Sequence, residues 1–75
     1  MSTDDLDALQ QSYKQAVDRW VAAIRAEEAL ANADHSETAM ENWDRADFAV
    51  QDAQKQAMHA RERYKDSLRQ LHYKM

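Results

Sequence analysis

Three histidines are the residues of this chain best suited to bind a transition metal, His35, His59 and His72. Carboxylate-bridged metal sites in helical bundles use Glu-x-x-His pairs that project inward from two helices. The residues three positions before these histidines are Asn32, Gln56 and Arg69, so the chain contains no such pair. His59 and His72 are also separated by a spacing that puts them on nearly opposite sides of a straight helix. The sequence therefore predicts no metal site and no cofactor.

Glu27 and Glu28 are a second candidate, because they lie close to the expected end of a first helix. Carboxylates are unfavourable there, since the C-terminal end of the helix dipole is negative. Glu27 also continues the seven-residue spacing of Leu6, Tyr13 and Trp20, where an apolar residue is expected. Such a local conflict can mark function, here loose Ca²⁺ binding or contact with a basic partner. We favour the plainer interpretation that helix packing ends before the turn and that both carboxylates are solvated.

Residues 61–74 combine basic side chains with Tyr64 and Tyr73. Nucleic-acid surfaces use this combination, because cations neutralise phosphates and aromatic rings stack on bases. Glu62 and Asp66 dilute the positive charge, and the whole chain carries a net charge of −4. A nucleic-acid-associated regulator that uses this basic C-terminal helix is therefore the alternative function and not the leading one.

Enzymatic chemistry has little support in the composition. The chain has no Cys and no Gly, which excludes a thiol nucleophile and a glycine-rich phosphate loop. No Ser has an obvious base near it in the sequence, and two helices alone do not enclose a pocket of the usual few hundred Å³. The sequence thus predicts a protein that is not an enzyme, with no evident small-molecule substrate.

The spacing of apolar residues predicts two long helices. In the first part of the chain they recur every three or four positions, which indicates an amphipathic helix over about residues 3–32, capped by Ser2 or Thr3. These residues are Leu6, Leu9, Tyr13, Val17, Trp20 and Ile24. In the second part a seven-residue repeat indicates a helix over about residues 36–73 with coiled-coil packing. One seam position of the repeat holds Trp43, Val50, Ala57, Tyr64 and Leu71, which are large except for Ala57, and the other holds the small residues Ala46, Ala53, Ala60 and Ser67.

The chain has one place to reverse direction, over about residues 32–36. It contains neither Gly nor Pro, so the break falls to Asn32, Asp34 and Ser36, whose side chains compete for backbone hydrogen bonds. The fold class is therefore all-α, a single domain that forms an antiparallel two-helix hairpin.

A turn centred near residue 34 also predicts which residues face each other. Their numbers should sum to about 68, which places Leu9 level with Ala57 and Ala60. The end of the second helix then extends beyond the first, and we expect this apolar and basic overhang to contact a partner. The overhang contains Leu68, Leu71, Tyr73 and Met75.

The chain is too short to build a large core by itself. A domain of about this size buries only ~60% of the surface of its unfolded chain, and small domains usually need a further staple. Disulfides are excluded because the chain has no Cys. We therefore expect a second copy of the chain to supply the additional buried surface, forming a homodimeric four-helix bundle. Val21, Phe48 and Met58 are apolar residues off the predicted seam that fit such a second interface, and Phe48 is the foremost of them.

The charges are unevenly distributed. Residues 1–52 hold twelve acids and four bases, whereas residues 53–75 hold two acids and six bases. No apolar run approaches the ~20 residues that span a bilayer, and the N-terminus is acidic, so we expect a cytoplasmic protein without membrane contact. The leading function is a small non-catalytic protein that acts through helix-to-helix contacts with other proteins. Its interaction candidates are Phe48, Leu68, Leu71, Tyr73, Glu27 and Glu28.

Overall fold

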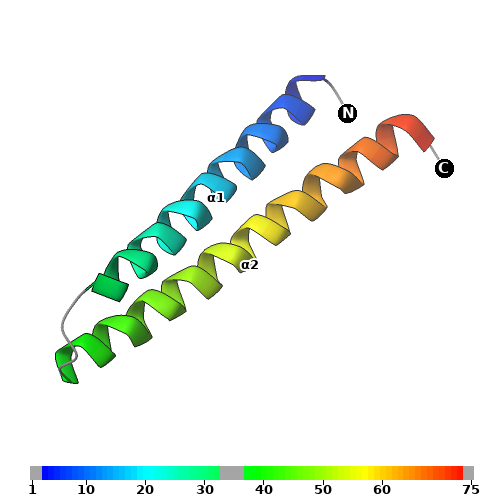
Figure 1. Cartoon of the computed structure of the whole chain (residues 1–75). Helices are drawn as coiled ribbons and strands as arrows, with labels where there is room; N and C mark the ends of the chain where they lie inside the picture. The colour runs from blue at the N-terminus through cyan, green and yellow to red at the C-terminus, as the bar shows by residue number, and fades with distance from the viewer. Residues whose placement is uncertain (1–2, 33–36, 74–75) are drawn as a thin grey trace.

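The computed structural model consists of two antiparallel helices joined by one turn (Figure 1). Helix α1 spans Thr3–Ala29, the 3₁₀ turn η1 follows over Leu30–Asn32, and helix α2 spans Glu37–Tyr73. The structure describes residues 3–32 and 37–73, with side chains for 5–31 and 38–72. The described elements are all helical and α1 packs against α2, which confirms the predicted all-α hairpin. The predicted cap Ser2 and the predicted turn residues Asp34 and Ser36 lie outside the described residues.

The hairpin is a rod. A helix of 37 residues is about 55 Å long at the usual rise per residue, and the Cα positions extend over 56 × 18 × 12 Å. Both described ends of the chain, Thr3 and Tyr73, lie at the end of the rod opposite the turn (Figure 1). Neither described helix contains a stretch apolar enough to cross a membrane.

The seam between the helices is built mainly from small residues. Ala57 is fully buried, Ala16 is 3% exposed and Ser67 is 7% exposed. Leu6 and Ala39 complete the buried set, and no large side chain of the described residues is fully buried. Since alanine carries only a methyl group, helices that meet through Ala16 and Ala57 can approach closely. The consequence is a thin core, in which the larger side chains are covered only in part.

The register of the helices differs from the one predicted from the turn. Ala16 and Ala60 line one groove between the helices, and Ser12 lines it together with Arg63. Facing residues therefore have numbers that sum to about 75. The prediction placed Leu9 at this level of α2, which is wrong by between one and two helical turns.

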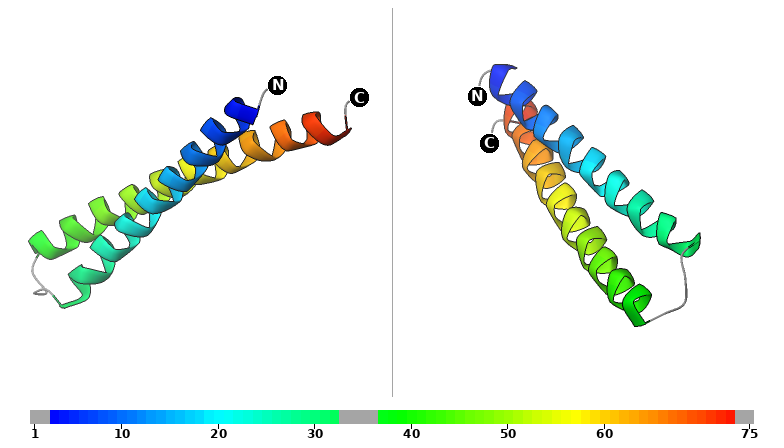
Figure 2. Two further views of the ribbon diagram at one scale, coloured as in Figure 1. Left: turned by 90° about the horizontal axis from the view of Figure 1, so that it is seen from above. Right: turned by 90° about the vertical axis from the view of Figure 1, so that its left-hand side faces the viewer.

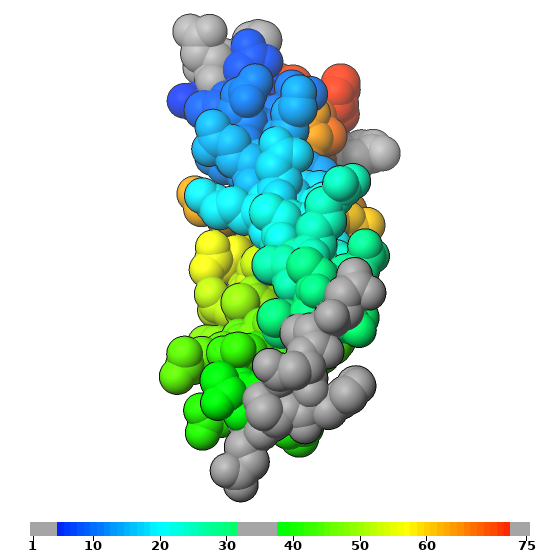
Figure 3. All heavy atoms as spheres, turned by 60° about the vertical axis from the view of Figure 1, so that its left-hand side comes forward, coloured from blue at the N-terminus to red at the C-terminus, as the bar shows by residue number. Residues whose placement is uncertain are grey.

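The error lies in the assumption that α2 begins level with the end of α1. Figure 2 shows, in two views, that the first turn of α2 lies beyond the last described residues of α1. In the space-filling view the green first turns of α2 likewise extend past α1 (Figure 3). Sequence numbers alone do not show this offset, because it depends on the path that the connection takes.

Candidate functional site

The predicted C-terminal overhang is shorter than expected. Ser67 is buried and Leu68 is half-buried, so the covered part of α2 extends past the point where packing was predicted to stop. Leu71 is 38% exposed although it continues the heptad seam. Tyr73 is the last residue of α2, and its side chain and Met75 lie outside the described part. Only the last turns of α2 therefore remain as an overhang.

Phe48 is the most exposed large apolar side chain of the described residues, at 71%. It lies nine positions before the buried Ala57, which is two and a half turns, so it points away from α1. Phe48 and Leu71 thus lie on different sides of α2 and do not form one patch.

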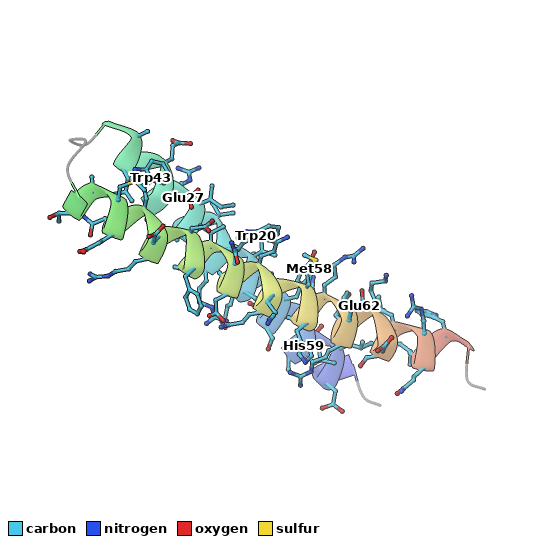
Figure 4. All side chains as sticks on the ribbon, turned by 90° about the horizontal axis from the view of Figure 1, so that it is seen from below. Trp20, Glu27, Trp43, Met58, His59 and Glu62 are labelled. Atoms are coloured by element: carbon cyan, nitrogen blue, oxygen red, sulfur yellow. The ribbon has the colours of Figure 1, made fainter. Side chains whose placement is uncertain are left out.

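Glu27 and Glu28 differ in their surroundings. Glu28 is exposed, in agreement with the solvated interpretation, whereas Glu27 is half-buried at its seam position. Figure 4 shows Glu27 and Trp43 toward the turn end of the hairpin. Within residues 5–31 and 38–72, no three His, Asp or Glu side chains come together as metal ligands. Among the described residues, Glu27 and Glu28 therefore belong to no cluster of metal-ligating side chains.

The basic segment 61–74 is partly neutralised by its own acids. Arg61 and Lys65 lie 3.4 Å and 3.8 Å from the Glu62 carboxylate, and Arg69 donates to Asp66 at 2.9 Å. These side chains are 37–62% exposed, so each pair contributes little stability. Their effect is to lower the positive charge that the segment presents to solvent.

One side of the hairpin carries most of the exposed apolar residues. Val21 and Ile24 are about 40% exposed on α1, and Met40 and Met58 are 64% and 37% exposed on α2. Met40 and Met58 are eighteen positions apart, or five helical turns, so they share one side of α2. We call these four residues the apolar flank.

Ile24 was expected to face α2, but a single neighbouring helix covers only a narrow stripe and leaves the edge of the apolar face open.

The opposite side of the hairpin is a basic groove of about 440 Å³. Its floor is formed by Ala16 and Ala60. Its rim is formed by polar and basic side chains of both helices, Ser12, Arg19, Lys55, Gln56, His59 and Arg63. No acidic residue lines it among those that the structure describes. The apolar flank and the floor of the basic groove lie on different sides of α2, since Met58 is two positions, or about 200°, from the groove residues Gln56 and Ala60. Lys55 and His59 lie between these two sides and also line a shallower hollow with Met58 and Glu62.

The groove was missed in the sequence because its cations are not neighbours there. Arg19 lies on the other helix, and Lys55, His59 and Arg63 recur every four residues among other polar side chains. The four-residue spacing is the usable signal, because it aligns the three along one face of a helix. Only the register of the helices brings Arg19 to the same groove.

The indole nitrogen of Trp20 is buried without a hydrogen-bond acceptor in the described structure. Trp20 lies on the seam and is half-buried as a whole. An unpaired buried donor lowers stability by about 1–3 kcal/mol, because its hydrogen bond to water is lost on folding. The Trp20 side chain therefore stabilises the fold through the packing of its large ring, and its N–H group does not contribute.

The chain matches no protein-family model, and comparison with curated proteins and with solved structures finds no matching protein.

Proposed function

We propose that this chain is a non-catalytic interaction module that acts through helix-to-helix contacts, and that its first partner is a second copy of itself. The apolar flank is the contact surface, and the product is a four-helix bundle. The observation that carries the proposal is that Val21, Ile24, Met40 and Met58 stay 37–64% exposed while the seam fully buries no large side chain. We expect the dimer to work in the cytoplasm.

The energetic argument compares the two surfaces. The seam supplies a thin core, and small domains with thin cores are marginal alone. Burying a large apolar side chain completely contributes about 1.5–3 kcal/mol, so completing the burial of each flank residue contributes on the order of 1 kcal/mol. Four such residues from each copy make a contribution comparable with the stability of a small domain, from which the cost of association is subtracted.

The charges beside the apolar flank favour one orientation of the pair. The turn half of this side carries Glu28 and Asp44, whereas the half near the chain ends carries Lys14 and Lys65, the latter paired with Glu62 at 3.8 Å. The spacings from Lys14 through Val21 to Glu28 and from Asp44 through Met58 to Lys65 are multiples of seven, which keeps each set on one helical face. A two-fold pair with turns at opposite ends brings acids onto bases, while turns at the same end bring acids onto acids. The antiparallel arrangement is therefore the proposed one.

Substitution of Ile24 by glutamate is expected to convert the dimer into a monomer. Two buried and unpaired carboxylates per dimer oppose association, and we expect the dissociation constant to rise at least about 100-fold. Sedimentation velocity at micromolar concentration measures this change. The matched control is Phe48→Glu, which introduces the same charge on the outward face of α2 and should leave the dimer intact.

Two results contradict the proposal. One is a wild-type protein that sediments as a monomer at these concentrations and unfolds cooperatively at a temperature independent of concentration. The other is the reverse outcome of the two variants, with Phe48→Glu dissociating the dimer and Ile24→Glu not, which would place the contact on the outer face of α2.

Cysteine cross-linking is expected to report the orientation. The chain has no native Cys, so Asp44→Cys and Lys65→Cys each introduce one defined thiol. In the antiparallel dimer, position 44 of one copy lies near position 65 of the other. A mixture of the two variants should therefore form a disulfide-linked dimer efficiently under mild oxidation, and each variant alone should not. Efficient cross-linking of Asp44→Cys with itself would contradict the antiparallel arrangement.

A further inference from the structure

We infer that the basic groove binds a small phosphate-bearing ligand that has a flat apolar group, such as a nucleoside monophosphate. The floor of the groove lies on a different side of α2 from the apolar flank, so this inference does not depend on self-association. It rests on three features of the groove: unpaired cations from both helices, an apolar floor, and a length that suits one small molecule.

The cations of the groove are unpaired, unlike their neighbours. Arg61, Lys65 and Arg69 are held by Glu62 and Asp66. Among the residues that the structure describes, the cations Arg19, Lys55 and Arg63 form no ion pair and no side-chain hydrogen bond, and neither does the His59 imidazole. Unpaired like charges on the rim of one groove repel each other, and a bound anion removes that repulsion. Arginine in particular binds phosphate through paired N–H groups.

The floor and the size of the groove narrow the class of ligand. Ala16 and Ala60 form an apolar floor between the two cationic rims, and Ala60 supplies most of its accessible surface because Ala16 is only 3% exposed. Such a floor suits an apolar ring better than a second charged group. The groove is open to solvent along its length, and its volume of about 440 Å³ is enough for one small molecule. The groove spans Ser12 to Arg19 on α1, about two turns, which is short for a nucleic-acid duplex. At one end, Gln56 donates to Asp52 at 2.9 Å, and this carboxylate limits where an anion can sit.

The experiment uses adenosine monophosphate as the probe, with inorganic phosphate and adenosine as its two halves. The ligands are titrated into the 75-residue chain and followed by the amide chemical shifts of Ser12, Arg19, His59 and Arg63. We expect adenosine monophosphate to bind more tightly than either half, with the largest shifts at these residues. Arg19→Gln and Arg63→Gln should each weaken binding at least about tenfold, the effect of losing one charge-assisted hydrogen bond.

Arg61→Gln and Arg69→Gln are the matched controls, because they remove the same charge from α2 outside the groove. At physiological salt they should change the affinity less than about twofold, since exposed charges that do not contact the ligand are largely screened. The inference is overturned if the controls weaken binding as much as the groove variants do. It is overturned equally if inorganic phosphate or adenosine binds as tightly as the monophosphate, or if millimolar monophosphate moves no groove resonance. Circular dichroism of each variant establishes that the helices are retained.

Discussion

Replacement of Ala57 by leucine is expected to lower the free energy of unfolding by about 1–3 kcal/mol. Ala57 is fully buried where Ala16 of the other helix is 3% exposed, so three further carbons have no space unless the helices move apart. If the helices separate at Ala57, the seam contacts on either side of this residue are also weakened, because the core is thin along its whole length. Ala16→Leu should have an effect of the same sign. Chemical denaturation followed by circular dichroism at one fixed protein concentration measures both.

The control for this substitution is Ala49→Leu on the same helix. Ala49 is exposed, and alanine and leucine have similar helix propensities, so the free energy of unfolding should change by less than about 0.5 kcal/mol. Wild-type stability in Ala57→Leu would mean that the helices do not meet closely at this level, and the described seam would be incorrect.

Two substitutions of Trp20 should differ greatly in their effect on the free energy of unfolding. Trp20→Ala removes a half-buried ring from the seam, with an expected loss of about 2–3 kcal/mol, less than for a fully buried tryptophan. Trp20→Phe keeps most of the ring and removes the unpaired indole N–H, so the lost contact area and the relieved desolvation oppose each other. The phenylalanine variant is expected to stay within about 1 kcal/mol of wild type in the same denaturation measurement.

Trp43 provides the comparison, because it is also half-buried while its indole N–H is not among the buried unpaired atoms of the described residues. Trp43→Phe loses contact area without relieving a buried donor and should therefore destabilise more than Trp20→Phe. The opposite order, with Trp20→Phe the more harmful, would indicate that the Trp20 nitrogen has an acceptor in solution.

The sequence was sufficient to predict the hairpin, because the spacing of apolar residues, the absence of Gly and Pro, and the single cluster of turn-forming residues agree with each other. It was not sufficient for the register. Reflection about residue 34 placed Leu9 beside Ala57, whereas the groove brings Ala16 to this level. The offset arises in the turn, where the relative height of two helix ends depends on backbone geometry that residue types do not specify.

The surfaces were predicted less well than the fold, for a related reason. Phe48 could be identified from its heptad position alone, since a residue opposite the seam is exposed whatever the register. The exposure of Ile24 could not be predicted in this way. Ile24 lies at the edge of the apolar stripe, where exposure depends on how much of the stripe the neighbouring helix covers. The groove required both the register and the spacing of cations, so its members are dispersed in the sequence.

The small seam residues tie the stability of this hairpin to the shape of its surface. Ala16 belongs both to the closest contact of the helices and to the floor of the groove, with Ala60 beside it. A larger side chain at either position that packed without strain would strengthen the core only by filling the hollow. Improvement of the fold and preservation of the hollow are therefore competing demands on the same two methyl groups, a trade-off that proteins commonly resolve at the expense of stability.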